Sequence, residues 1–221
     1  MNALSTVVTI IGTGVILFNF IFASVLSKSQ NSILKVFFIC ILIALLESVN
    51  SIFGIFLPTY IHTFCFPIQN ILFLLDSFFW AFFFLKVLKD EKSQKNLKIL
   101  FGITFTISAY LLYSNNITQV STQVLAVINI CKTIFCILYY RNLFKMISSQ
   151  NLLRDPIFWF VTGVLLYSCI SLPIYCLNNY IRLQFPLLIA RNIFSISNMF
   201  IIIMNIFFIK AFLCTTSQHK A

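Results

Sequence analysis

Four ionisable residues interrupt long apolar stretches of the chain: Glu47, Asp76, Lys132 and Arg191. A charged side chain that faces lipid costs about 2.5–3.5 kcal/mol on membrane-insertion scales, so such residues tend to face the interior of a helix bundle and to pair. Two acids balance two bases here. Arg191 stands nearest the end of its apolar stretch, where a long side chain can also extend to the membrane surface. The pattern predicts a polar cluster inside the apolar part of the protein.

Polar residues accompany these charges at helical spacing. Asn129 precedes Lys132 by three positions, and Ser195 and Asn198 follow Arg191 by four and seven, which places each group on one helix face. The predicted intramembrane polar cluster consists of Glu47, Asp76, Asn129, Lys132, Arg191, Ser195 and Asn198. Two interpretations are open: a cavity that binds a ligand or relays protons or ions, and a set of interhelical hydrogen bonds and ion pairs that stabilises the bundle.

The chain has few residues at the spacing that catalysis or metal binding requires. It contains two His and seven Cys, no CxxC pair, and none of the motifs HExxH, GxSxG or Walker A. Glu47 and Asp76 form a candidate acid–base pair, but a salt bridge with Lys132 explains these residues more simply. We therefore predict no metal, no cofactor and no catalytic residue.

The composition is typical of an integral membrane protein. Hydrophobic residues make up 60% of the 221 positions, charged residues only 9%, and the mean hydropathy is +0.99. Soluble domains usually carry about 25% charged residues. The net charge of +10 would suggest a nucleic-acid partner for a soluble protein. Here the basic residues lie in short connections beside apolar stretches, which indicates topology signals and no nucleic-acid partner.

Seven stretches reach the roughly 20 apolar residues that a membrane-spanning helix needs. They predict helices at about 4–26, 34–57, 67–88, 97–114, 119–141, 156–177 and 186–213. Pro67, Pro156 and Pro186 are each expected at a helix start, where the missing N–H has little effect. The connections are short, so we expect residues 1–221 to form a single all-α domain, a bundle of seven transmembrane helices.

Lysine and arginine are distributed unequally between the two sides of this predicted bundle. Twelve lie in or beside the connections after the first, third and fifth helices and after the seventh, whereas the opposite connections hold only Arg182. Because basic residues mark the cytoplasmic side, the N-terminus is expected outside and the C-terminus inside. The expected location is the inner (plasma) membrane of a bacterial cell, crossed several times.

One segment resembles known proteins. Residues 153–160 (LRDPIFWF) and 162–167 (TGVLLY) are similar to a segment of small seven-helix bacterial membrane proteins of unknown function. Glu47 and the stretch from Gln69 to Asp76 fit the same pattern, and the helical regions also resemble the membrane portions of some sensor histidine kinases. The resemblance implies a sensory or accessory membrane role and supplies no catalytic residue.

Three functions follow from these observations. The first is a non-enzymatic sensory or accessory signalling protein, whose partners are the lipid bilayer and a signalling protein at the cytoplasmic face. The second is a small transporter or ion- or proton-conducting protein that uses the same charged residues. The third is a membrane-embedded enzyme that modifies a lipid, with Glu47 and Asp76 as acid and base.

Overall fold

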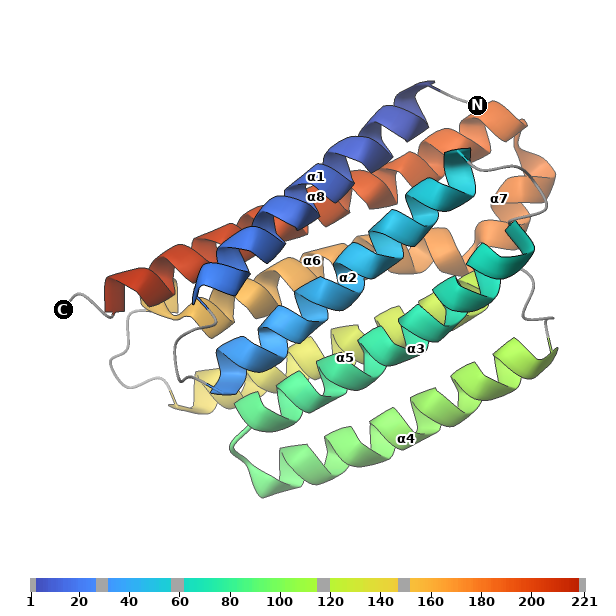
Figure 1. The fold of residues 1–221 in the computed structure, drawn as a ribbon. Coiled ribbons are helices and arrows are strands. Elements are labelled where there is room, and N and C mark those ends of the chain that lie inside the picture. Colours follow the sequence, from blue (N-terminus) through green and yellow to red (C-terminus); the bar gives the residue numbers. More distant parts are fainter. Residues whose placement is uncertain (1–2, 27–31, 57–61, 115–119, 147–151, 219–221) are drawn as a thin grey trace.

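The computed structural model describes residues 3–26, 32–56, 62–114, 120–146 and 152–218, and these ranges are almost entirely helical, with no strand (Figure 1). Seven helices within them are long and apolar enough to cross a membrane. They are α1 (Ala3–Leu26), α2 (Ser32–Phe56), α3 (His62–Val87), α4 (Glu91–Ser114), α5 (Thr122–Met146), α6 (Pro156–Cys176) and α8 (Leu187–Gln218). The short helix α7 (Asn178–Gln184) joins α6 to α8. The predicted all-helical fold with seven long apolar helices is confirmed.

The long helices lie side by side in one bundle (Figure 1). Helix α8 packs against α6 and α1, α2 packs against α1 and α3, and α5 packs against α6. Helix α4 lies at the edge, against α3 and α5. We call the end where α1, α3 and α5 begin the N-terminal end of the bundle, and the end where α2, α4 and α6 begin and α8 finishes the C-terminal end (Figure 1).

Aromatic side chains fill the core in the half of the bundle toward the C-terminal end. Phe37 near the start of α2, Phe160 near the start of α6 and Phe212 near the finish of α8 are each at most 1% exposed. The Phe37 ring meets that of Phe208 edge to face, with centroids 5.0 Å apart, and Trp80 meets Phe83 in the same way at 5.5 Å. This geometry suits the ring quadrupoles and leaves little space between the helices.

Polar caps define the helix ends at the C-terminal end of the bundle. The Asp90 carboxylate accepts hydrogen bonds from the Ser93 hydroxyl and amide at 2.7 and 3.1 Å, and these bonds lower the pKa of Asp90. Gln94 Nε2 donates to the Leu88 carbonyl at 2.6 Å, across the turn between α3 and α4. Asp155 caps α6 by accepting from the Ile157 amide at 2.9 Å. Each bond satisfies a backbone or side-chain group that helix geometry leaves free.

Two details of the helices differ from the sequence prediction. Pro67 does not start a helix as predicted: α3 begins at His62, and Pro67 lies inside it. A tertiary contact helps to hold the extra helical residues before Pro67, because the Cys65 carbonyl accepts a hydrogen bond from Asn50 Nδ2 of α2 at 2.9 Å. Helix α4 begins at Glu91, six residues before the predicted apolar start, because capped polar residues continue the helix beyond its apolar part. Pro156 opens α6 as predicted.

Helices α6 and α8 approach each other closely at Gly163. A Cβ at this position would lie 3.0 Å from Phe207 Cβ and 3.1 Å from the Met204 carbonyl oxygen. Small residues allow such close backbone contact between membrane helices. The absence of a side chain at Gly163 therefore sets the separation of α6 and α8.

Candidate functional site

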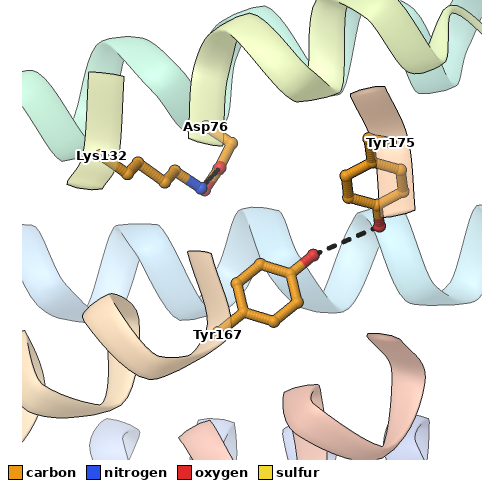
Figure 2. A network of polar contacts seen from close by, with 4 residues as sticks. All are labelled: Asp76, Lys132, Tyr167 and Tyr175. Carbon is orange, nitrogen blue, oxygen red and sulfur yellow. Dashed lines mark hydrogen bonds and ion pairs between the residues drawn. The ribbon is translucent and has the colours of Figure 1, made fainter. Parts of the chain in front are cut away.

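Asp76 of α3 and Lys132 of α5 form an ion pair in the middle of the bundle. Lys132 Nζ lies 2.5 Å from Asp76 Oδ2, and each side chain is 11% exposed (Figure 2). The same ammonium lies 5.5 Å from the centroid of the Trp80 ring. Because an unpaired charge at this depth is strongly unfavourable, each residue neutralises the charge of the other.

Both members of the pair line a cavity of about 490 Å³. Six of the seven long helices contribute to its wall, all except α4. The cavity falls within the size range of small-molecule sites in proteins. Its apolar wall includes Ile16, Ile41, Val164, Ile201, Met204 and Phe208, and its polar wall includes Thr9, Ser48, Asn50, Ser51, Gln69 and Asn198. The cavity therefore combines apolar surface with hydrogen-bonding groups around a charged centre.

The cavity occupies the half of the bundle toward the N-terminal end. Its lining includes Val8 near the start of α1, Cys65 near the start of α3, Ser51 near the finish of α2 and Val120 just before α5. These helix ends lie together in Figure 1. In the other direction the lining reaches Trp80, Val164 and Phe208, which also belong to the buried core that continues toward the C-terminal end. Among the described residues, the cavity thus lies mainly in one half of the bundle and borders the aromatic core of the other half.

Comparison with protein-family models, curated proteins and solved structures found no match to this chain. The site is therefore interpreted from its own geometry.

A chain of hydroxyl groups joins α6 to α8 beside the cavity. Tyr167 lines the cavity, and its hydroxyl lies 3.5 Å from that of Tyr175 (Figure 2). The Tyr175 hydroxyl lies 3.3 Å from the Ser197 hydroxyl. Ser197 also bonds Ser171, at 2.8 Å. Hydrogen bonds therefore connect Tyr167 to α8 through Tyr175.

Uncharged pairs hold the other helices around the cavity. Asn50 Nδ2 donates to Gln69 Oε1 at 2.7 Å, which joins α2 to α3. Thr13 and Ser48 share a hydrogen bond of 2.5 Å, which joins α1 to α2. Asn198 contacts Thr9 at 3.5 Å between α8 and α1. The polar wall is thus made largely of interhelical contacts.

Glu47 differs from the other buried charges. Its Oε1 is buried and has no hydrogen-bond partner among the residues that the structure describes. Glu47 interacts electrostatically with both Asp76 and Lys132. It stands on α2 between Ala44 and Ser51, one turn from each, and both of these residues line the cavity. Glu47 itself is not part of the cavity lining.

The other predicted cluster residues are placed differently. Asn198 lines the cavity. Asn129 and Ser195 are buried, at 2% and 3% exposure, but neither is part of the cavity lining. The side chain of Arg191 lies outside the described residues.

Sequence reasoning missed the hydroxyl chain on α6. Tyr167, Ser171 and Tyr175 recur at intervals of four, which places them on one helix face. That spacing is the signal that could have identified them, together with the bonded Ser197. Among the described residues, no group of three or more His, Cys, Asp or Glu side chains is arranged to hold a metal ion.

Proposed function

We propose that this chain is a multi-pass protein of the bacterial inner membrane, with its N-terminus outside, that binds a small molecule in its cavity and signals occupancy to a protein partner at the cytoplasmic face. The unequal distribution of basic residues supports the orientation. In this orientation the cavity lies in the outer half of the membrane.

The observation that carries the proposal is the one-sided cavity. It extends from the N-terminal end of the bundle to the Asp76–Lys132 pair, and buried aromatic residues fill the other half. A conduction path needs polar space through both halves of the membrane, whereas a binding chamber needs only one. Because the Asp76 carboxylate is bonded to Lys132, the geometry also favours binding over acid–base chemistry on a lipid.

The two bonded helices supply a route from the chamber to the opposite end. Tyr167 lines the cavity and contacts Tyr175, which bonds Ser197 of α8. Gly163 brings the same two helices into contact on the cytoplasmic side of Tyr167. Packed helices with a shared hydrogen-bond network can couple two sites when both sites bias their arrangement. A ligand that moves Tyr167 would thereby act on the cytoplasmic ends of α6 and α8.

Filling the cavity tests the binding proposal. Gly12 lines the cavity, and a Cβ there would meet Ile202 Cγ1 at 4.0 Å, an ordinary van der Waals contact. Gly14, on the same helix, is exposed and has no atom within 4 Å of such a Cβ. Gly12→Leu is therefore expected to occupy the chamber, and Gly14→Leu serves as its matched control.

Trp80 provides the readout, because it lines the cavity and the chain has only two Trp. In a Trp159→Phe background reconstituted in lipid nanodiscs, benzyl alcohol should change Trp80 emission in a saturable manner. Gly14→Leu should preserve this response and Gly12→Leu should remove it. An unchanged response in Gly12→Leu would show that the probe binds elsewhere and would contradict the proposal.

Buried charges at mid-depth favour a second candidate, a transporter, because such residues often mark ion and proton paths. Proteoliposome measurements separate the two functions. Ion or solute flux that requires wild-type protein, and that disappears in Asp76→Asn protein shown to be folded under the assay conditions, would favour transport over sensing.

A further inference from the structure

Among the described residues, Asp76 and Lys132 are the two charged side chains in the wall of the cavity. Each side chain is 11% exposed and both line the cavity, so a bound molecule meets both of them. Their opposite charges are in contact and cancel, and Glu47 lies outside the lining. An ion in the chamber would therefore find only counter-charges that already have a partner.

The ion pair nevertheless keeps some capacity for hydrogen bonds. An ammonium group has three N–H donors. Among the described residues, Lys132 Nζ donates one hydrogen bond, to Asp76 Oδ2. The Trp80 ring, whose centroid lies 5.5 Å away, attracts the positive charge without supplying an oxygen acceptor. Because buried donors in proteins normally have acceptors, the remaining donors of Lys132 suit an oxygen atom of an occupant.

The uncharged polar side chains of the wall are largely engaged with neighbouring helices. The Asn50–Gln69 pair already joins α2 to α3. Asn205 of α8 also lines the cavity, and its Oδ1 accepts a hydrogen bond from Asn19 Nδ2 of α1 at 2.6 Å. A ligand that replaced these bonds would have to disrupt contacts that hold the bundle together. The ion pair is therefore the better attachment point for a polar group.

Apolar side chains surround the ion pair in the cavity wall. They include Trp80, Val164, Met204 and Phe208. The volume of about 490 Å³ is in the range of small-molecule sites and far larger than a single metal ion requires. A compact apolar body that carries one uncharged oxygen group, such as a hydroxyl or a carbonyl, matches both the volume and the wall.

We propose that the chamber selects uncharged amphipathic molecules, and that the Asp76–Lys132 pair both binds their oxygen group and excludes ions. The inference rests on the proposed binding function and names its ligand class. An uncharged oxygen accepts a hydrogen bond from Lys132 and leaves the ion pair intact. An ion has to displace one partner of the pair or remain without a counter-charge.

Four probes built on one benzene ring test this selectivity: benzyl alcohol, benzylammonium, benzoate and toluene. Their affinities are measured in nanodiscs from Trp80 emission in the Trp159→Phe background. Benzyl alcohol should bind about tenfold more tightly than either ion, because a buried charge without a partner is strongly unfavourable. Gly12→Leu should remove the response to benzyl alcohol, which places the bound probe in the chamber.

Single substitutions in the pair should change the selectivity in opposite directions. Lys132→Met leaves the Asp76 carboxylate without its partner, so the affinity for benzylammonium relative to benzyl alcohol should rise about tenfold. Asp76→Asn leaves the ammonium unpaired, so benzoate should gain by a similar factor. Each ratio is compared between variants in the same lipid, so differences in how the probes partition into the membrane cancel.

Lys92→Met and Glu91→Gln are the matched controls for these substitutions. Each removes an exposed charge of the same sign at the start of α4, outside the cavity lining, and should leave the ratios unchanged.

The double variant Asp76→Leu/Lys132→Met decides the matter where the single variants do not fold, because it contains no unpaired charge from the pair. It should still bind both ions weakly. The advantage of benzyl alcohol over toluene should fall about tenfold, since the hydrogen bond from the charged donor is gone.

The outcomes distinguish this inference from the binding function. If Gly12→Leu removes the response to benzyl alcohol but either ion binds the unsubstituted pair as tightly as benzyl alcohol, the selectivity inference is wrong and the binding function stands. The same conclusion follows if folded single variants leave the ratios unchanged, or if the double variant keeps the full advantage of benzyl alcohol over toluene. If Gly12→Leu affects no probe, both proposals fail.

Discussion

At the scale of single residues, the main feature is the buried ion pair between Asp76 and Lys132, in which each charge compensates the other. Lys132 of α5 and Asp76 of α3 are both buried, and their side chains form an ion pair between the two helices. An ion pair in such a place contributes little net stability compared with apolar residues of the same volume. Removing only one of the two charges destabilises the protein much more, because the remaining buried charge then has no partner.

This asymmetry predicts the behaviour of three variants. Asp76→Asn should lower the free energy of unfolding by about 3–5 kcal/mol, because it leaves the Lys132 ammonium unpaired. The double variant Asp76→Asn/Lys132→Met should recover most of this loss, since the uncompensated charge is gone. Thermal unfolding followed with a thiol-reactive dye measures the effect, because buried free cysteines such as Cys40 and Cys136 become accessible on unfolding.

Lys92→Gln is the control for this series, because it removes an exposed charge far from the pair. A double variant that is no more stable than Asp76→Asn would show that the two charges do not compensate each other.

At the scale of helices, the close packing of neighbouring helices depends on a few positions with small side chains. The α6–α8 contact is the most extensive in the bundle, and Gly163 lies within it against Phe207 and Met204. Helices that pack closely at one point transmit small displacements along their length, because their interiors resist compression. The same contact lies between the hydroxyl chain around Tyr167 and the C-terminal end of the bundle.

Gly163→Ala should therefore destabilise the protein by about 1–3 kcal/mol, the usual effect of overpacking a tight interior. The added methyl group would lie 3.0 Å from Phe207 Cβ, which forces α6 and α8 apart. Gly102→Ala on α4 is the matched control: a Cβ there meets no atom within 4 Å, so better helix propensity should leave stability unchanged or slightly higher. Equal thermal unfolding midpoints for the two variants would contradict the packing role of Gly163.

At the scale of the whole molecule, charge separates the two ends of the bundle. Exposed basic residues cluster at the C-terminal end, where α3 meets α4 and α5 finishes; they include Lys86, Lys89, Lys92, Lys95, Arg141 and Lys145. Arg182 is exposed on α7, which lies at the opposite end of the bundle (Figure 1). Because short basic loops are retained in the cytoplasm, the unequal distribution of basic residues between the two ends is expected to determine the orientation in the membrane.

Cysteine labelling of intact cells tests this orientation. A membrane-impermeant maleimide should label Arg182→Cys in intact cells, and it should label Lys92→Cys only after the membrane is opened. The unaltered chain, labelled in parallel, measures the reaction of the native thiols. The reverse pattern would place the cavity in the cytoplasmic half of the membrane and would exclude an outer ligand.

The sequence by itself determined the seven long helices, because the length of an apolar stretch is a local property and lipid accepts only helices or closed barrels. It also indicated that Asp76 and Lys132 would find charged partners, since unpaired charges are costly in any apolar surrounding. The early start of α3 before Pro67 was not predicted, because a hydrogen bond from another helix helps to hold that turn.

Only the tertiary structure decided which charges meet and where space remains. Glu47 and Asp76 are both acidic residues in apolar stretches of the sequence. Asp76 is paired with Lys132, whereas Glu47 has a buried oxygen without a hydrogen-bond partner among the described residues. The cavity in one half and the aromatic core in the other arise from how side chains of six helices interlock. Helical periodicity defines the face on which a residue lies, but the rotation and separation of neighbouring helices decide what that face contacts.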